Sequence, residues 1–158
     1  MDKMLMRKAE RGDAGAISAL IHDLMPFMTL APDGAGAEQF MLSMAAEAIE
    51  RYVTGEAYQY WTGWLDDGLA GVVALRNGTH LFHLYVARRH HDQGHARQLW
   101  ETARAAVPAA QAMTVNASVY AVPMYQHFGF AATGPRVEQH GIAYVPMRLE
   151  QNAPGEGA

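Results

Sequence analysis

The sequence predicts a mixed α/β fold (α+β), in which an antiparallel meander continues into a parallel strand pair. Three apolar runs rich in β-forming residues, about 57–65, 69–76 and 79–86, are separated by Asp66-Asp67-Gly68 and Asn77-Gly78. Asn-Gly between such runs is the strongest short hairpin signal. A helical period from Gly94 to Pro108 and an apolar run at 113–116 follow. A strand, helix, strand unit implies that its two strands are parallel.

Two helices are predicted before the meander. A short segment at 5–9 is suited to an edge strand. Asp13 then stands at the N-cap position of a helix over about 14–25, in which apolar residues recur at helical spacing until Pro26. After a loop at 28–37, a second stripe predicts a helix that ends near Gly55, and its apolar residues are Phe40, Met41, Met44, Ala48 and Ile49.

The last third of the chain predicts one more helix and two closing strands. Ser118 is placed to cap a helix that passes through Tyr125 and ends at Gly129, with an irregular first turn at Pro123. The closing strands fall near 130–137 and 142–149. Because half of the 158 residues are apolar, one core can be buried, and we expect one domain over 1–150. The small, polar segment 151–158 is expected to be a disordered tail.

Composition argues against several classes of function. The net charge of -4 and the pI of about 6.0 give no basic field for nucleic acid or an anionic membrane surface. The absence of cysteine excludes disulfides, thiolate metal sites and a cysteine nucleophile, and favours a reducing compartment. No apolar run approaches the roughly 20 residues of a membrane helix, and the N-terminus lacks an apolar signal core. We therefore expect a cytoplasmic, unprocessed protein.

The loop His91-Asp92-Gln93-Gly94-His95-Ala96 connects the third strand to the following helix. The start of that helix leaves free backbone N–H groups and the positive end of the helix dipole, which together bind phosphate. Gly94 allows the backbone to approach an anion closely, Ala96 keeps the first turn small, and Arg97 can add a charge contact. A glycine at a helix start usually means only a tight turn, so the loop alone is weak support for such a site.

Two blocks together resemble the GNAT superfamily of acyl-CoA-dependent N-acetyltransferases. Leu84-Tyr85-Val86 followed by His91-x-x-Gly94-x-Ala96 is similar to motif A, written Q/R-x-x-G-x-G/A, with His91 as a departure at its first position. Val115-Asn116-Ala117-Ser118, then Ala121 and Tyr125-x-x-x-Gly129-Phe130, resembles motif B. The resemblance implies a GNAT-like fold: two N-terminal helices, an antiparallel meander, a splayed parallel strand pair flanking the cofactor helix, and antiparallel C-terminal strands.

The resemblance also implies a reaction and its residues. Acetyl-CoA would be the cosubstrate and a small-molecule or peptide amine the acceptor, by direct attack. Tyr125 lies where the family places the acid that protonates the leaving thiolate; the alternative is that its ring only packs under the sheet. Asn116 resembles the asparagine that binds the pantetheine arm, and Ser118 lies beside it; Asn116 could instead cap the next helix.

The run His80-Leu81-Phe82-His83-Leu84-Tyr85-Val86 breaks strict alternation, because Leu81 and Leu84 are an odd number of residues apart. A β-bulge between 82 and 83 would restore the phase and place His80, His83 and Tyr85 on one face. His83 and His80 are the candidate general bases, since imidazole titrates near neutrality; a water chain is the alternative. Backbone groups of Leu84, Tyr85 and Val86 would bind the pantetheine arm and polarise the thioester carbonyl.

Other interpretations stay open. Five histidines, at 80, 83, 90, 91 and 95, suggest a metal site with Asp92, which we disfavour because a metal would occupy the anion site. A GNAT-like acyl-CoA sensor without catalysis is a further alternative. The acceptor is expected against 25–40, 56–66 and 136–141, a surface with many aromatic residues that could instead be core or a homodimer interface; Asp23, Asp33, Glu38 and Glu56 there suggest a cationic amine.

Overall fold

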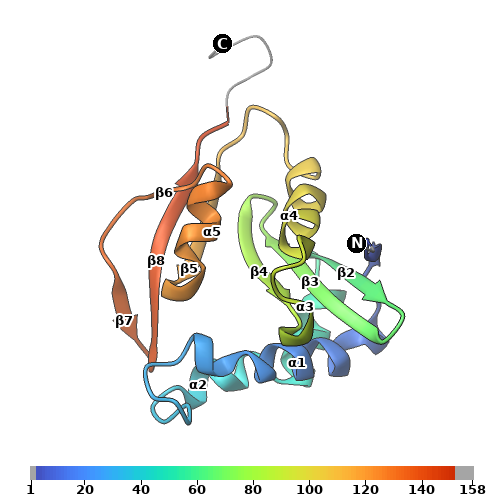
Figure 1. Cartoon of the computed structure of the whole chain (residues 1–158), viewed down its shortest axis with the longest axis horizontal. Helices are drawn as coiled ribbons and strands as arrows, with labels where there is room; N and C mark the ends of the chain where they lie inside the picture. Colours follow the sequence, from blue (N-terminus) through green and yellow to red (C-terminus); the bar gives the residue numbers. More distant parts are fainter. Residues whose placement is uncertain (1–2, 152–158) are drawn as a thin grey trace.

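The computed structural model describes residues 3–151 (Figure 1). The α-helices are α1 (Ala14–Asp23), α2 (Glu38–Leu42), α3 (Ala46–Thr54), α4 (His95–Ala105) and α5 (Val122–His127). Short 3-10 helices are η1 (Arg11–Asp13), η2 (Met25–Phe27), η3 (Arg88–His90) and η4 (Val119–Ala121). The strands are β1 (Leu5–Lys8), β2 (Tyr58–Leu65), β3 (Gly68–Arg76), β4 (His80–Val86), β5 (Met113–Ser118), β6 (Ala131–Ala132), β7 (Val137–Gln139) and β8 (Ile142–Leu149).

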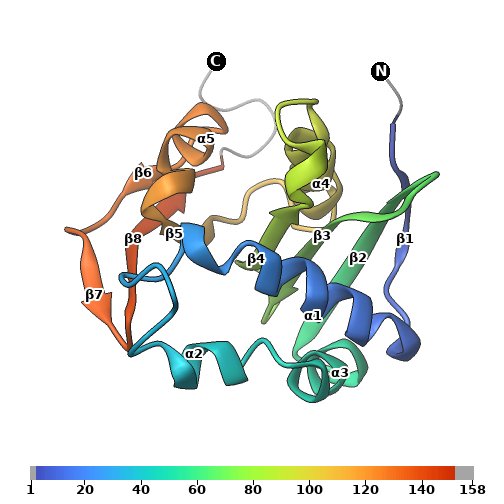
Figure 2. The same cartoon turned by 60° about the horizontal axis from the view of Figure 1, so that its bottom comes forward.

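All described strands belong to one eight-stranded sheet in the order β1-β2-β3-β4-β5-β8-β6, and β7 also pairs with β8. The predicted antiparallel meander is confirmed in β2, β3 and β4. Only β4 and β5 are parallel, and they pair at His80–Thr114 and Leu81–Val115 before they separate. Figure 1 shows the two halves of the sheet, with β2–β4 on the right and β5–β8 on the left, and Figure 2 shows β1 beside β2. The predicted splayed strand pair is therefore present.

Helices cover both faces of the sheet. In Figure 2, α1, α2 and α3 lie along one side, and α4 and α5 stand on the other. One core cluster joins α4 and α5 to the sheet through residues such as Leu99, Trp100 and Phe130. The second lies between the sheet and α1 and α3, and includes Ile17, Ile49 and Val72. The sheet is thus the middle of three layers, and its splayed strands lie between the two cores.

The predicted bulge lies at Phe82. Ala74 of β3 faces His83 and Leu75 faces Leu81, so Phe82 is the extra residue of β4. Leu81, Leu84 and Val86 consequently share the core beneath α4, whereas Phe82 and Tyr85 face the α1 side. The break in hydrophobic alternation predicted this feature because a single inserted residue shifts the phase of a strand by one.

The predicted second helix is wrong in one respect, since the chain interrupts it between α2 and α3. The Ser18 hydroxyl of α1 donates a hydrogen bond of 2.7 Å to the Met44 carbonyl, and the Tyr52 hydroxyl donates one of 3.1 Å to the Ser43 carbonyl. Side chains thereby bind carbonyls that helical N–H groups would otherwise take. The apolar stripe predicted the buried face and gave no sign of the interruption.

The closing strands also differ from the prediction. The expected strand at 130–137 is divided into β6 and β7, with Gly134 and Pro135 between them, because proline has no N–H to donate to a ladder. Gln151 does not belong to a free tail: its amide donates to the Gln111 carbonyl at 2.7 Å and its oxygen accepts from Arg104 at 3.1 Å. The rest of the predicted tail, residues 152–158, lies outside the described residues.

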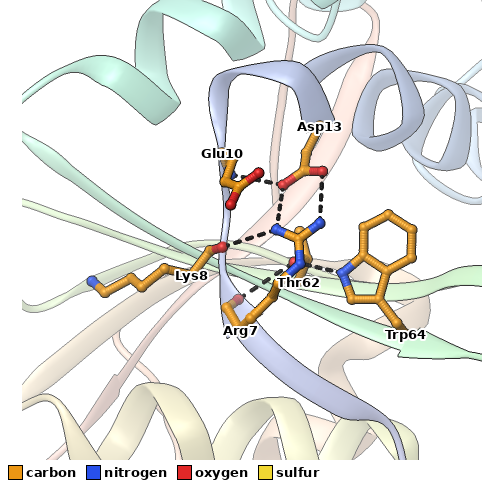
Figure 3. Close-up of polar contacts among 6 residues, drawn as sticks. All are labelled: Arg7, Lys8, Glu10, Asp13, Thr62 and Trp64. Carbon is orange, nitrogen blue, oxygen red and sulfur yellow. Dashed lines mark hydrogen bonds and ion pairs between the residues drawn. The ribbon is translucent and has the colours of Figure 1, made fainter.

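Asp13 occupies the expected N-cap position of α1, but its side chain makes no capping bond to that helix. Figure 3 shows its carboxylate bound by both terminal nitrogens of Arg7, at 2.8 and 3.0 Å, and by the Glu10 N–H at 2.7 Å. The Arg7 hydrogen bonds lower the pKa of Asp13. Asp13 therefore ties β1 to the start of α1.

None of the helices within residues 3–151 is long and apolar enough to span a bilayer.

Candidate functional site

A cavity of about 740 Å³ lies where β4 and β5 separate, within the size range of small-molecule sites. It extends from the loop before α4 to the residues around η2, α2 and β8. Twelve of the fifteen residues predicted from the sequence line it: His80, Leu84, Tyr85, Val86, His91, Asp92, Gly94, His95, Ala96, Asn116, Ser118 and Tyr125. The other three, His83, Gln93 and Arg97, are not among its lining residues.

The loop before α4 has the backbone of an anion site. Gly94 is the N-cap residue with φ of 83°, and Asp92 also has a positive φ of 62°. The first backbone bond of the helix runs from the Gln98 N–H to the Gly94 carbonyl, so the N–H groups of residues 95–97 have no helical acceptor. These groups and the helix dipole meet at the cavity wall, where they can hold a phosphate.

Side chains of this loop have structural roles as well. The His95 ring, buried in the protein, contacts the Gln93 amide oxygen at 3.3 Å. Arg97 points to Glu101 at 3.7 Å on the exposed side of α4. The predicted charge contact of Arg97 with a ligand therefore finds no support in its position.

His91, the departure from the motif, has a defined function in the loop. Its Nε2 lies 2.8 Å from the Val86 carbonyl oxygen, which can only accept, so Nε2 carries the proton. The bond ties the loop to the end of β4. The sequence left the contribution of this side chain open, and the structure shows that His91 anchors the loop through a backbone carbonyl.

The free edge of β4 faces the cavity. The Ala87 N–H bonds to the Ala70 carbonyl, and by the alternation of an antiparallel ladder the N–H and C=O groups of Leu84 and Val86 then point away from β3. Beyond Leu81, β4 has no register with β5. The predicted backbone site is thus narrower than 84–86, because the backbone groups of Tyr85 are directed to β3.

Tyr125 lies in α5 at the opposite wall, packed edge-on against Phe130 with ring centroids 5.5 Å apart. The residue is 5% exposed and lines the cavity. Its hydroxyl forms no hydrogen bond to any described residue, and burial, with the nearby Tyr85 hydroxyl, raises its pKa. A protonated hydroxyl without a partner is available to a ligand in the cavity.

His80 begins β4 and lines the cavity. Its Nδ1 lies 2.8 Å from the Thr114 hydroxyl of β5. Burial and the charge of Arg76 lower the pKa of His80 to about 4, so the ring is neutral at pH 7. A neutral imidazole can accept a proton only transiently or relay it.

His83 lies in the core, apart from the cavity. It is 2% exposed, stacks on Phe82 with centroids 4.1 Å apart, and its Nδ1 is 2.9 Å from the Tyr60 hydroxyl. Its Nε2 has no partner among the described residues, and burial lowers its pKa to about 3. This position does not favour the predicted role of general base.

The expected acceptor surface is only partly correct. Phe27, Met28 and Gln139 line the cavity, from the predicted segments 25–40 and 136–141. Segment 56–66 contributes no lining residue, because β3 and β4 lie between β2 and the splay. Its aromatic residues, Tyr58, Tyr60, Trp61 and Trp64, pack in the cores. Asp23, Asp33, Glu38 and Glu56 do not line the cavity either, so their positions give no support to the expectation of a cationic amine.

Several lining residues were not predicted. Arg76 at the end of β3, Tyr120 of η4 and Tyr144 of β8 are examples. Tyr120 is 62% exposed and its ring lies tilted against Phe27, with centroids 4.7 Å apart, so it joins the η4 wall to the η2 wall. The sequence did contain a pattern that places Arg76, because the Asn77-Gly78 hairpin pairs it with His80. For Tyr120 and Tyr144 no local pattern indicated the cavity.

A metal site finds no support in the described part of the chain, where no group of three His, Asp or Glu side chains is arranged to hold an ion. His90 binds Asp67 at 3.0 Å and His91 binds the Val86 carbonyl. The clustering of histidines in the sequence therefore reflects separate structural contacts.

Comparison with known proteins gives three findings. Residues 28–151 match the family model described as acetyltransferase (GNAT) domain. No curated protein sequence matches the chain. Among solved structures, a GCN5-related N-acetyltransferase from Rhodopseudomonas palustris is similar with a TM-score of 0.73 and 19% identity, over 95% of this chain and 97% of that one.

Two further structures show the same fold. The PaiA N-acetyltransferase from Thermoplasma acidophilum, solved in complex with coenzyme A, has a TM-score of 0.69 and 13% identity, over 95% of this chain and 99% of that one. The apo form of YjaB from Escherichia coli has a TM-score of 0.65 and 21% identity, over 97% and 100%. The family model covers most of the chain, and the protein belongs to the GNAT acetyltransferase superfamily.

Proposed function

We propose that this protein transfers the acetyl group of acetyl-CoA to a primary amine by direct attack. The observation that carries the proposal is the Tyr125 hydroxyl, which lies without a hydrogen-bond partner among residues 3–151 in a cavity between an anion-binding loop and the free edge of β4. A binding module has no need of an unpaired tyrosine hydroxyl in the cavity wall, whereas a leaving thiolate requires a donor.

The cosubstrate fits the residues present. The free N–H groups at the start of α4 suit the pyrophosphate, and the peptide-like groups of the pantetheine arm suit the N–H and C=O groups of Leu84 and the N–H group of Val86 on the free edge of β4. The Val86 carbonyl already accepts from His91. Asn116 and Ser118 of β5 line the facing wall.

The protons that move during the reaction give a role to two side chains, Tyr125 and His80. When bound, acetyl-CoA supplies an acetyl group activated as a thioester. The amine nitrogen forms a bond to the carbonyl carbon, the carbon–sulfur bond breaks, and Tyr125 donates its proton or a hydrogen bond to the departing sulfur. Its raised pKa keeps the hydroxyl protonated at pH 7. His80, neutral at that pH, relays the proton lost by the amine to solvent, directly or through water.

Steady-state release of free thiol with a panel of primary amines tests this assignment. Tyr125→Phe removes one oxygen that has no partner among the described residues, so the melting temperature should stay within about 2 °C of the parent, while kcat falls by about 100-fold, the lower end of general acid effects. Tyr120→Phe is the matched control, since Tyr120 also lines the cavity and should retain its activity. A Tyr125→Phe variant as active as the parent would remove Tyr125 from this role.

Binding separates the enzyme from a non-catalytic acyl-CoA sensor. Acetyl-CoA at a hundred times its dissociation constant should add about 2.7 kcal/mol to the free energy of unfolding. Binding without turnover of any panel member would support the sensor. No thermal shift with acetyl-CoA would contradict both functions.

A further inference from the structure

Arg76 is a guanidinium in the cavity wall without an anionic partner. It is half-buried at the end of β3 and lines the cavity. Within residues 3–151 its side chain forms no ion pair and no hydrogen bond, and its one close polar interaction is with the face of the Phe82 ring, 5.3 Å from the centroid. Seven of the other nine arginines have a carboxylate within 4 Å. The two that have none among the described residues, Arg51 and Arg104, are exposed to solvent, unlike Arg76.

The position of Arg76 assigns it to the acceptor side of the cavity. It faces His80, the first residue of β4, whereas the anion-binding loop follows Val86 at the other end of that strand. The two ends are roughly 20 Å apart for six residue steps of extended chain. The free edge at Leu84 lies between them along β4. A CoA phosphate bound at the loop is therefore too far away to be the partner of Arg76.

The cavity wall around Arg76 contains no carboxylate and is mostly apolar. Asp92 is the one acidic residue that lines the cavity in the described chain, and it belongs to the anion-binding loop. Around the acceptor side the wall is made by Phe40, Met44, Phe82, Ile142 and Tyr144. A cationic acceptor such as a polyamine would meet a like charge and no anion there, which disfavours its binding.

Arginine in an apolar pocket suits a planar anion. Its guanidinium presents parallel N–H groups that match a carboxylate at two points, and such charge-assisted bonds are about twice as strong as neutral ones. A half-buried charge that lacks a partner within the protein is left with a desolvation cost that a ligand can offset. The Phe82 ring attracts the charge of the guanidinium, whose central carbon lies 5.3 Å from the ring centroid, but offers no hydrogen-bond acceptor to its N–H groups.

We propose that the acceptor is an amino carboxylate with an apolar body, such as a hydrophobic amino acid, and that Arg76 binds its carboxylate while the amine is directed towards Tyr125. This inference rests on the proposed acetyl transfer, and it names the substrate class for the same site. The apolar wall receives the side chain of the acceptor, and Arg76 discriminates against the corresponding amine without a carboxylate.

Matched substrate pairs test the proposal. We would measure kcat/KM for L-phenylalanine against 2-phenylethylamine and for L-leucine against isopentylamine, with spermidine as the cationic reference. The parent should prefer each amino acid by at least tenfold. Arg76→Met keeps the length and apolar contact with Phe82 and removes the charge, and it should raise KM for the amino acids by about 10–100-fold, the equivalent of a hydrogen bond to a charged group. The kcat/KM for the plain amines should change by less than threefold.

Two control variants isolate the effect of position. Arg76→Lys keeps the charge without the two-point geometry and should recover part of the loss. Arg51→Met removes an exposed guanidinium from the neighbouring helix α3 and should leave the preference intact. A parent that prefers the plain amines, or an Arg76→Met variant that lowers kcat/KM equally for both members of a pair, would overturn the proposal.

A binding measurement keeps this result apart from the proposed function. Titration calorimetry with N-acetyl-L-phenylalanine and N-acetyl-2-phenylethylamine requires no turnover. We expect the carboxylate to bind the parent at least tenfold more tightly, and this advantage to disappear in Arg76→Met while coenzyme A affinity is unchanged. Equal affinities would refute the carboxylate site even if amines are acetylated. A carboxylate advantage without acetylation of any amine would instead refute the proposed reaction alone.

Discussion

Replacing Gly141 by alanine should destabilise the protein more than the same replacement at Gly78. Both glycines lie in hairpin turns with nearly the same backbone: φ is 53° and 81° at Asn77 and Gly78, and 54° and 76° at His140 and Gly141. The cost of a left-handed alanine is therefore about equal in the two variants. They differ in space, since a Cβ on Gly78 has no atom within 4 Å.

At Gly141 an added Cβ would overlap the Gly36 carbonyl carbon and lie 2.5 Å from the Ala37 nitrogen. These are backbone atoms, which cannot rotate away as a side chain would. The left-handed conformation costs alanine about 1–2 kcal/mol, and forced displacement of packed backbone adds about 1–3 kcal/mol. The expected loss is about 1–2 kcal/mol for Gly78→Ala and about 2–5 kcal/mol for Gly141→Ala.

Urea denaturation of the two variants and the parent would measure this difference. In a domain of this size each kcal/mol of lost stability lowers the melting temperature by about 2–4 °C. The melting temperature should therefore fall by about 2–8 °C in Gly78→Ala and by about 4–20 °C in Gly141→Ala. The Leu30 N–H bonds to the Gly141 carbonyl at 2.8 Å, and this bond holds the segment that follows Phe27 and Met28 of the cavity wall. Displacing Gly141 should therefore also raise KM for the acceptor. Equal unfolding free energies for the two variants would show that the contact between Gly141 and the 36–37 backbone does not exist in solution.

Three further predictions concern charge and the loop. The pKa of His80 is lowered to about 4, so the rise of kcat/KM with pH should follow only the deprotonation of the acceptor amine. A second titration near pH 6.5 in the pH profile, absent in His80→Gln, would contradict the neutral state of the ring. Asp13→Asn should cost about 1–2 kcal/mol at pH 7 by urea denaturation. Because the folded pKa of Asp13 is lowered, this stabilisation is complete above its ordinary pKa of about 3.9 and is lost as pH falls through the folded value, so the two proteins should converge in acid; a gap that persists at pH 2 would refute the ion pair as its source. His91→Ala should weaken acetyl-CoA binding by about 2–10-fold in calorimetry, one neutral hydrogen bond, whereas His91→Gln, which keeps a donor, should bind like the parent; equal loss in both would mean that the imidazole itself is required.

Local patterns predicted those parts of the fold that depend on neighbours in sequence. The break in alternation around Phe82 located the bulge, and the Asn-Gly turn located a hairpin. Ser118 was expected to cap the helix that contains Tyr125, but it caps the short η4 before it, through the Ala121 N–H. The interruption at Ser43–Ala45 could not be predicted, because it depends on the Ser18 hydroxyl of another helix.

The same distinction applies to the site. The loop at 91–96 and Tyr125 belong to local motifs, and both line the cavity. His83 and His80 share a strand and a face, yet the bulge and the packing of α1 and α3 bury one and leave the other at the cavity. Arg76 stood next to a recognised hairpin, but its significance depends on the absence of a carboxylate around it, which requires the three-dimensional arrangement of α2, β4 and β8.

The two halves of the sheet are connected at two places. The first is the short parallel pairing of β4 with β5, at His80–Thr114 and Leu81–Val115. The second is the contact of Thr29 and Leu30 with the start of β8 and the turn before it. Tyr125 belongs to one half of the sheet and the free edge at Leu84 to the other. The two connections set the distance between them. Residues outside the ligand site, Thr114 and Gly141 among them, therefore control how the acetyl donor and the amine acceptor are aligned in the cavity.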